Sequence, residues 1–195
     1  MASDISPQAA RILESAKAHI ASGGYSGFSY ADISAEVGIT KASIHHHFPK
    51  KSDLVRVLLQ RYRASAAQGL AALSAGIANP YDRLQAYTAW WAACIADATM
   101  PICICAMLSA EIPSLPAEVA AEVRLHFDHL ATWIEETLTA GQTGQALQLQ
   151  GAPATEAQAF MATVHGAMLS ARACGNPALF DTIVGALMAR LKAPG

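Results

Sequence analysis

The chain has 195 residues, enough to bury a substantial core in one domain or in two small ones. Its composition is 53% hydrophobic and only 14% charged, with many Ala and Leu residues, which favours a soluble, helix-rich protein. Gln85, Asp97 and Pro101 interrupt the longest apolar stretches, so none reaches the roughly 20 residues that a membrane-spanning helix needs. The N-terminus lacks the basic flank and apolar run of a signal peptide. We therefore expect a cytoplasmic protein and exclude a membrane protein.

The net charge of −2 conceals opposite charges in the two parts of the chain. Residues 1–63 hold eight Lys and Arg against five Asp and Glu, a net charge of +3. Residues 64–195 hold five against ten, a net charge of −5. The N-terminal part is therefore the expected partner of a polyanion.

Helical periodicity runs through the whole chain, and no segment has a convincing strand pattern. Glycines and prolines mark where the helices begin and end. The predicted helices run from about Ile5 to Gly23, Tyr30 to Val37, Lys41 to His47, from after Pro49 through the Ala-rich region 64–75, from Pro80 past Cys94, Pro101 to Glu111, Ala117 to Ala140, 154 to 173 and 177 to 192. The sequence thus predicts an all-α fold of about nine helices.

The segment 30–47 has the features that a helix-turn-helix requires. Such a unit needs a small residue where its two helices cross, a glycine in the turn, and an apolar seam. Ser34 is small, and Gly38 can adopt the positive φ that stops the first helix. Thr40 is a good N-cap for the second helix, its hydroxyl accepting from the backbone N–H of Ser43. The seam consists of Ile33, Val37, Ile39 and Ile44. The second helix can therefore enter a major groove by its N-terminal turns.

These residues resemble a known family. The match consists of Gly24-Tyr25 and of Phe28-Ser29-Tyr30-Ala31-Asp32-Ile33-Ser34-Ala35-Glu36-Val37-Gly38-Ile39-Thr40-Lys41-Ala42-Ser43-Ile44-His45-His46-His47-Phe48-Pro49-Lys50-Lys51. In this segment the chain resembles the tetracycline-repressor (TetR) family of bacterial regulators. The resemblance implies a three-helix DNA-binding domain over residues 1–50 and a helical ligand-binding and dimerisation domain over residues 51–195.

The resemblance also implies which residues meet double-stranded DNA. The helix from Lys41 to His47 would read base edges and phosphates, and the start of the next helix would hold the backbone. The expected contacts are Thr40, Lys41, Ser43, His45, His46, Lys50 and Lys51. Two positions depart from the family pattern, because His45 replaces a usual tyrosine and Lys50 replaces a usual capping serine. Lys51 is the firmest expected phosphate contact.

No metal or cofactor is expected. Consecutive helical residues point about 100° apart, so His45, His46 and His47 cannot converge on one ion. One or two of them are expected to face DNA or solvent and one to pack against the motif, with Phe48 in the core. Cys103 and Cys105 lie two residues apart, which is not the spacing of a zinc or redox pair, and four cysteines do not form a disulfide scaffold.

The last two helices carry continuous apolar stripes. In the family the matching pair forms a four-helix bundle with its twofold mate, so the resemblance implies a homodimer that reads a palindromic operator. The alternative is that both stripes serve only the chain's own core. The expected interface residues are Phe160, Val164, Met168, Phe180, Ile183, Val184, Leu187, Met188 and Leu191.

The middle helices concentrate aromatic and sulfur-containing residues. Each residue alone is best explained as core, but family resemblance implies an inducer pocket here, largely apolar and suited to a small hydrophobic or aromatic molecule. The expected lining is Tyr87, Trp90, Trp91, Cys94, Cys103, Met107, His126, Phe127, Trp133 and His165.

The leading hypothesis is a ligand-responsive repressor that releases its operator when an inducer binds. A first alternative is a thiol sensor of electrophiles or oxidants, because the segment from Pro101 to Glu111 resembles that of a TetR subgroup in which a cysteine matching Cys103 is reactive, with Cys105 beside it. Remote alternatives are a ligand-binding protein without DNA binding and an enzyme. Nothing in the spacing of the cysteines and histidines selects a catalytic pair, so no enzymatic activity is expected.

Overall fold

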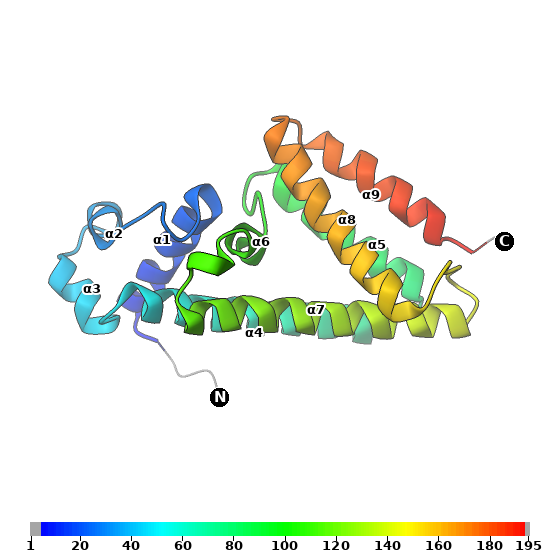
Figure 1. Cartoon of the computed structure of the whole chain (residues 1–195), viewed down its shortest axis with the longest axis horizontal. Helices are drawn as coiled ribbons and strands as arrows, with labels where there is room; N and C mark the ends of the chain where they lie inside the picture. Colours follow the sequence, from blue (N-terminus) through cyan, green and yellow to red (C-terminus); the bar gives the residue numbers. More distant parts are fainter. Residues whose placement is uncertain (1–4, 194–195) are drawn as a thin grey trace. The chain divides into compact units, whose positions relative to one another are not determined.

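The computed structural model describes residues 5–193, so the outer ends of the two domains expected over 1–50 and 51–195 lie outside the described residues. Over residues 5–193 the chain forms nine α-helices and no strand. The prediction of an all-α fold with about nine helices is confirmed (Figure 1).

The chain divides into two compact units. The first comprises the residues up to Ser65 together with Ile104–His126, and the second comprises Ala66–Cys103 and the chain from Phe127 onward. This division differs from the boundary expected between residues 50 and 51, because a later segment folds back to complete the first unit.

The first unit contains the predicted helix-turn-helix. It consists of α1 (Pro7–Gly23), α2 (Tyr30–Val37), α3 (Lys41–His47), the start of α4 (Lys51–Gly76), α6 (Ile104–Ser109), the single 3₁₀ turn η1 (Ile112–Ser114) and the start of α7 (Ala117–Thr143). Ile12, Ile20, Ile33 and Ile44 are fully buried, so one apolar core joins α1, α2 and α3. Phe48 is also buried, as predicted. Because α6 packs against α1, the fold ties the later segment directly to this core.

The second unit is also a helical bundle. It consists of the rest of α4, α5 (Pro80–Ala96), the rest of α7, α8 (Pro153–Ala173) and α9 (Ala178–Leu191). Helices α8 and α9 lie side by side, and α5 packs against α9 (Figure 1). The carboxylate of Glu156 on α8 accepts a hydrogen bond from the guanidinium of Arg190 on α9 at 2.9 Å, which fixes the pairing of these two helices.

Two predicted helix ends were wrong. Helix α6 begins at Ile104 instead of Pro101, because Asp97 caps the N–H of Thr99 in a turn and the N–H of Met100 bonds to the carbonyl of Cys94. Helix α7 continues past Gly141 to Thr143. A Cβ at Gly141 would overlap the side chain of Leu147, so this glycine permits close packing of the returning chain and does not end the helix.

Candidate functional site

Local hydrogen bonds set the geometry of the helix-turn-helix. Ser29 and Asp32 form a capping box at the start of α2, and Gly38 ends that helix with φ 72° and ψ 38°. The hydroxyl of Ser34 donates to the carbonyl of Ile39 at 2.5 Å across the turn. Thr40 caps α3 by accepting from the N–H of Ser43 at 3.1 Å, as predicted. The angle between the two helices therefore rests on short-range contacts that the motif itself supplies.

The N-terminal turn of α3 is open to solvent. Thr40, Lys41, His45 and His46 are exposed, Lys50 is exposed before α4, and Ser43 is half-buried. These residues offer hydroxyl and ammonium donors around a helix N-terminus, the arrangement that suits phosphates and base edges. The structure therefore places six of the seven expected DNA contacts on an accessible surface.

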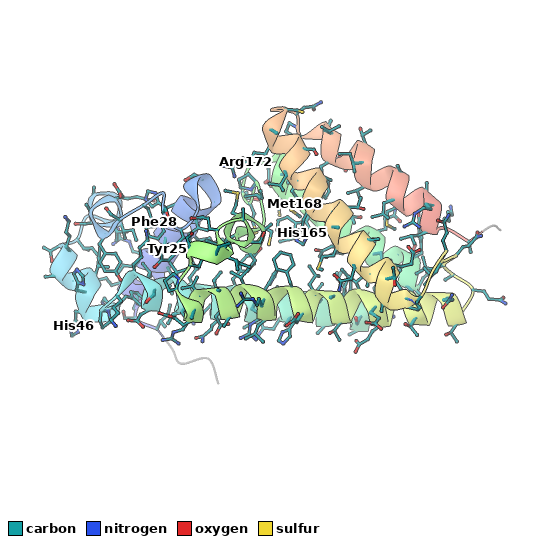
Figure 2. All side chains as sticks on the ribbon, viewed as in Figure 1. Tyr25, Phe28, His46, His165, Met168 and Arg172 are labelled. Carbon is teal, nitrogen blue, oxygen red and sulfur yellow. The ribbon has the colours of Figure 1, made fainter. Side chains whose placement is uncertain are left out.

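The three histidines have different surroundings. His45 lies edge-on to the ring of Tyr30, with centroids 4.8 Å apart, and its Nδ1 is 3.2 Å from the carbonyl of Pro49. His47 packs against α1, with its Nε2 3.0 Å from the side-chain oxygen of Gln8. His46 remains exposed on α3 (Figure 2). His46 is thus the histidine of the three that is best placed to meet DNA.

Lys51 does not extend its ammonium toward the outside. Its Nζ donates to the carbonyl of Tyr25 at 2.5 Å and to that of Phe28, and it lies over both rings, 4.7 Å and 4.0 Å from their centroids. Burial lowers the pKa of Lys51, while the nearby carboxylates of Glu111 and Asp32 act to raise it. In this conformation the side chain supports the loop between α1 and α2, so the sequence-based assignment of Lys51 as the firmest phosphate contact does not match its geometry.

Glu111 holds the same loop through its backbone amides. Its Oε1 accepts from the N–H of Tyr25 at 2.8 Å and its Oε2 from the N–H of Ser26 at 3.3 Å. A Cβ at Gly24 would overlap Oε1, so only glycine lets the carboxylate approach this closely. No local pattern in the sequence signals this role of Glu111, because its partners are 86 and 85 positions away. Glu111 and Lys51 together hold both the amides and the carbonyls of the loop between α1 and α2. This loop carries the rings of Tyr25 and Phe28 (Figure 2).

The residues expected to line one inducer pocket fall into different units. Met107 and His126 belong to the first unit, where His126 is buried against the ring of Tyr62, with centroids 5.4 Å apart. Trp90 is 50% exposed, so it is not a buried lining residue. Cys103 and Cys105 are fully buried, with Cys103 immediately before α6. The expected set of ten therefore does not form one site within either unit.

A smaller aromatic cluster does form inside the second unit. The ring of Tyr87 lies 5.7 Å from that of Trp133 and 6.4 Å from that of Phe160, and all three side chains are buried. The rings of Phe127 and His165 lie 5.1 Å apart, edge to face. Burial raises the pKa of the Tyr87 hydroxyl above its ordinary value. Four of these residues, Tyr87, Phe127, Trp133 and His165, belong to the predicted pocket lining, and their role in ligand binding stays a prediction.

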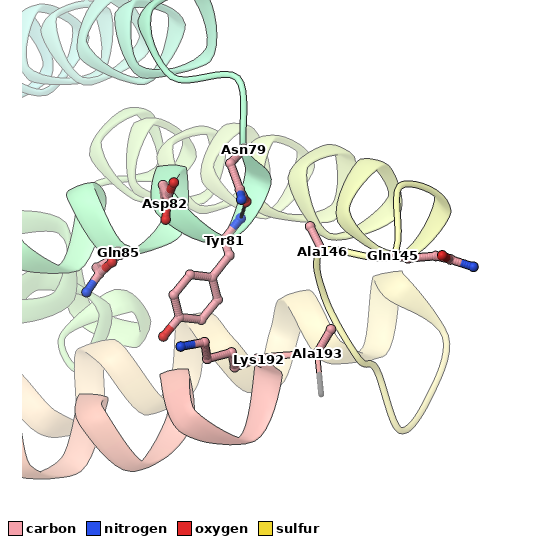
Figure 3. Close-up of a pocket in the computed structure, with 8 residues that line it drawn as sticks. All are labelled: Asn79, Tyr81, Asp82, Gln85, Gln145, Ala146, Lys192 and Ala193. Carbon is pink, nitrogen blue, oxygen red and sulfur yellow. Dashed lines mark hydrogen bonds between the residues drawn. The ribbon is translucent and has the colours of Figure 1, made fainter. Parts of the chain in front are cut away.

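A separate hollow of about 440 Å³ lies elsewhere on the second unit (Figure 3). Its lining is mostly polar: Asn79, Tyr81, Asp82, Gln85, Gln145, Ala146, Lys192 and Ala193. The ammonium of Lys192 lies 5.9 Å from the centre of the Tyr81 ring. None of these residues was expected to line a pocket, and the open, polar hollow does not have the lining of a site for a hydrophobic molecule.

The apolar stripes of α8 and α9 face the chain's own core. Eight of the nine expected interface residues are at most 7% exposed within the single chain, and Ile183 is half-buried. The alternative interpretation of the sequence, that the stripes serve the internal core, therefore describes these residues. The opposite face of the two helices is exposed and carries many small side chains: Ala159, Ala162, Gly166, Thr182, Gly185, Ala186 and Ala189. The larger exposed side chains of α8 and α9 are Gln158, Leu169, Arg172 and Asp181.

No helix within residues 5–193 is long and apolar enough to cross a membrane.

The fold and the exposed turn of α3 define a helix-turn-helix DNA-binding protein with a second helical unit. Residues 12–58 match the model of the bacterial regulatory proteins of the tetR family, and residues 80–187 match the tetracyclin repressor-like C-terminal domain. The chain belongs to the TetR family of transcriptional regulators.

Solved structures agree with this assignment. A TetR-family transcriptional regulator from Agrobacterium tumefaciens is 50% identical, with a TM-score of 0.94 over 95% of this chain and 98% of that one. NemR from E. coli in its reduced form is 20% identical, with a TM-score of 0.82 over 96% and 99% of the two chains. A protein from Saccharomonospora viridis in complex with choline is 21% identical, with a TM-score of 0.80 over 95% and 98%. The last two show the shared fold alone. Comparison with curated protein sequences found no match.

Proposed function

We propose that the protein is a homodimeric repressor that binds a palindromic operator and releases it when a small hydrophobic or aromatic inducer occupies the second unit. The observation that carries the proposal is the exposed, Thr40-capped start of α3 with Lys41 and His46 at its surface and Lys50 just beyond it. A rigid helix N-terminus with exposed donors fits a major groove, and a twofold pair of such helices fits half-sites about 34 Å apart.

The path of the chain supports a link between inducer and operator. The backbone passes from one unit to the other within α4, between Cys103 and Ile104, and within α7. A ligand that prefers one conformation of the second unit can therefore bias the first unit through these three connections. Glu111, a few residues after α6, then transmits that bias to the loop that precedes α2.

Operator binding is the direct test. The full-length protein would be titrated against a palindromic duplex from the region upstream of its own gene, over a range of salt concentrations. The logarithm of the binding constant should fall linearly with the logarithm of salt concentration. A folded dimer that does not bind this duplex more tightly than a scrambled one at low salt contradicts the proposal.

We further propose that the dimer forms through the small-residue face of α8 and α9. Small side chains allow helices to approach closely, and a Cβ at Gly166 or Gly185 would meet no atom of the described residues. Gly166→Arg should therefore convert the dimer into a monomer, measured by analytical ultracentrifugation. Gly69→Arg is the matched control, because Gly69 is also an exposed helical glycine with open space above it, on α4. A dimer that survives Gly166→Arg with unchanged dissociation constant argues against this face.

Inducer binding is proposed ahead of thiol sensing because Cys103 and Cys105 have no exposed surface, whereas Cys174 is exposed. A sensing thiol must meet its oxidant or electrophile, and buried cysteines react slowly. N-ethylmaleimide should label Cys174 first, and Cys174→Ser protein should retain operator binding after the same treatment. Rapid labelling of Cys103 with loss of operator binding, abolished by Cys103→Ser, would support the thiol sensor instead.

A further inference from the structure

One buried nitrogen of the second unit has no hydrogen-bond partner. His165, in the middle of α8, is only 8% exposed. Its Nδ1 lies 2.9 Å from the carbonyl of Met161, while Nε2 is buried and has no partner. Among the buried side-chain atoms described in the second unit, this nitrogen alone is unpartnered. A buried polar atom without a partner costs stability, so the position calls for an explanation.

The contact with Met161 determines what Nε2 can accept. A backbone carbonyl only accepts hydrogen bonds, so Nδ1 must carry the hydrogen. In the neutral ring Nε2 then carries the lone pair and accepts a hydrogen bond. The atom that completes this site is therefore an O–H or N–H donor.

The neighbouring side chains are aromatic and apolar. The ring of Phe127 stands edge to face with the imidazole, and Phe160 on the same helix is buried. Met168, one turn after His165 on α8, is also buried (Figure 2). Phe160 contacts the ring of Tyr87, which also contacts Trp133. The indole N–H of Trp133 is already bonded to the hydroxyl of Ser74 at 2.9 Å. The surroundings of His165 thus suit an aromatic body, and the imidazole supplies the polar contact.

We infer that His165 Nε2 is the hydrogen-bond acceptor for the inducer, and that the inducer is an aromatic molecule bearing a hydroxyl, of the phenol or naphthol class. This inference rests on the proposed function, since it specifies the ligand that the second unit binds. It also predicts which ligands the protein prefers. An aromatic molecule without a hydrogen-bond donor leaves Nε2 without a partner. An aromatic carboxylate only accepts hydrogen bonds, so it cannot bond to Nε2, which is also an acceptor. Discrimination by one buried hydrogen bond is expected to be about ten-fold in affinity.

The test compares three probes of nearly equal size by isothermal titration calorimetry of the full-length protein without DNA. 1-Naphthol should bind about ten-fold more tightly than 1-methoxynaphthalene and 1-naphthoate. His165→Leu should remove the preference for 1-naphthol, and His165→Gln, which restores an acceptor oxygen, should recover part of it. His129→Gln is the matched control, because His129 is an exposed histidine on α7.

A second measurement does not depend on any variant folding. In ¹⁵N NMR spectra of the wild-type imidazoles, the Nε2 resonance of His165 should shift on addition of 1-naphthol and not of 1-methoxynaphthalene. The inference is overturned by any of four results: equal affinity for the three probes, no binding of any of them, tighter binding of 1-naphthoate, or an unchanged preference in His165→Leu. The last result leaves a buried water as the partner of Nε2. Operator binding by the ligand-free protein is measured separately, so failure here and failure of the proposed function are distinguishable.

Discussion

The carboxylate of Glu111 accepts a hydrogen bond from the backbone N–H of Tyr25 at 2.8 Å, across 86 positions of the sequence. The loop that Glu111 holds connects α1 to α2, so the residue stabilises the entry to the helix-turn-helix. Glu111→Ala leaves the amides of Tyr25 and Ser26 without their acceptor. The free energy of unfolding should fall by about 1 to 2 kcal/mol in urea titrations, the usual effect of removing a charged hydrogen bond in a partly buried place. Glu135→Ala, at an exposed position of α7, is the control and should change it little. An equal loss of stability in both variants speaks against the contact.

Two glycines with similar φ should respond differently to alanine. Gly24 has φ 73° and ψ −168°, and an added Cβ meets Glu111, whereas Gly38 has φ 72° and ψ 38° and open space around it. Gly38→Ala should cost about 1 kcal/mol, the usual effect of an alanine in the left-handed region. Gly24→Ala should cost about 2 to 3 kcal/mol, because its backbone region is poorer for an L-residue and Glu111 must move away. Thermal unfolding of both variants checks the order, and a greater loss of stability in Gly38→Ala contradicts it.

The adjacent lysines at the start of α4 should have separable roles. Lys50 is exposed, whereas the ammonium of Lys51 is bonded to the loop carbonyls and lies over the Tyr25 and Phe28 rings. Lys51→Met should lower the free energy of unfolding by about 2 kcal/mol, because methionine can make neither the two hydrogen bonds nor the cation–π interactions.

Lys50→Met should leave the free energy of unfolding within about 0.5 kcal/mol of wild type, because the Lys50 side chain is exposed. The same substitution should make operator binding less dependent on salt, because each phosphate that a lysine neutralises contributes about one unit to the slope. Urea titration and fluorescence anisotropy at several salt concentrations measure the two effects. The reverse pattern, with Lys50 controlling stability and Lys51 the salt slope, contradicts the roles inferred from the geometry.

The ion pair between α8 and α9 makes stability depend on pH in a defined direction. The hydrogen bond from Arg190 holds the pKa of Glu156 below its ordinary value of 4.5, and the charge of Arg190 adds to this effect against desolvation. A carboxyl whose folded-state pKa is lowered contributes stability above its unfolded-state pKa and loses it as pH falls through the folded value. The stability advantage of wild type over Glu156→Gln should therefore be constant at about pH 6 to 8 and shrink below about pH 4.5. Glu136→Gln, exposed on α7, is the control. An advantage that grows toward acid pH contradicts the assignment.

Local signals in the sequence were sufficient for most of the helices. Gly38, Thr40 and Asn79 make their capping contacts within four residues along the chain, so the end of α2 and the starts of α3 and α5 could be predicted. The start of α6 could not be predicted from Pro101, because the chain before it is held by a turn at Asp97. Proline permits a helix to start but does not require it.

The site residues depend on contacts that sequence spacing does not encode. The sequence does not show whether a lysine side chain is exposed or turned inward. The orientation of Lys51 depends on its contacts with the rings of Tyr25 and Phe28, which lie far from it in the sequence. The stripes on α8 and α9 predicted burial correctly but not the covering partner, because an internal core and a dimer interface both demand apolar residues. Leu169, 49% exposed on α8, is the large apolar residue that the outer face retains.

The first unit is built from two separate segments of the chain, so it can be completed only after the second segment has been synthesised. The helix-turn-helix emerges from the ribosome about 60 residues before Glu111 and α6, which complete its loop and cover α1. A nascent or truncated chain that ends in α4 would thus carry the DNA-reading helices without the carboxylate that fastens their entry. An isolated N-terminal fragment is therefore expected to be less stable than the same helices in the full-length regulator, and a stop codon before residue 111 removes Glu111 together with α7, α8 and α9.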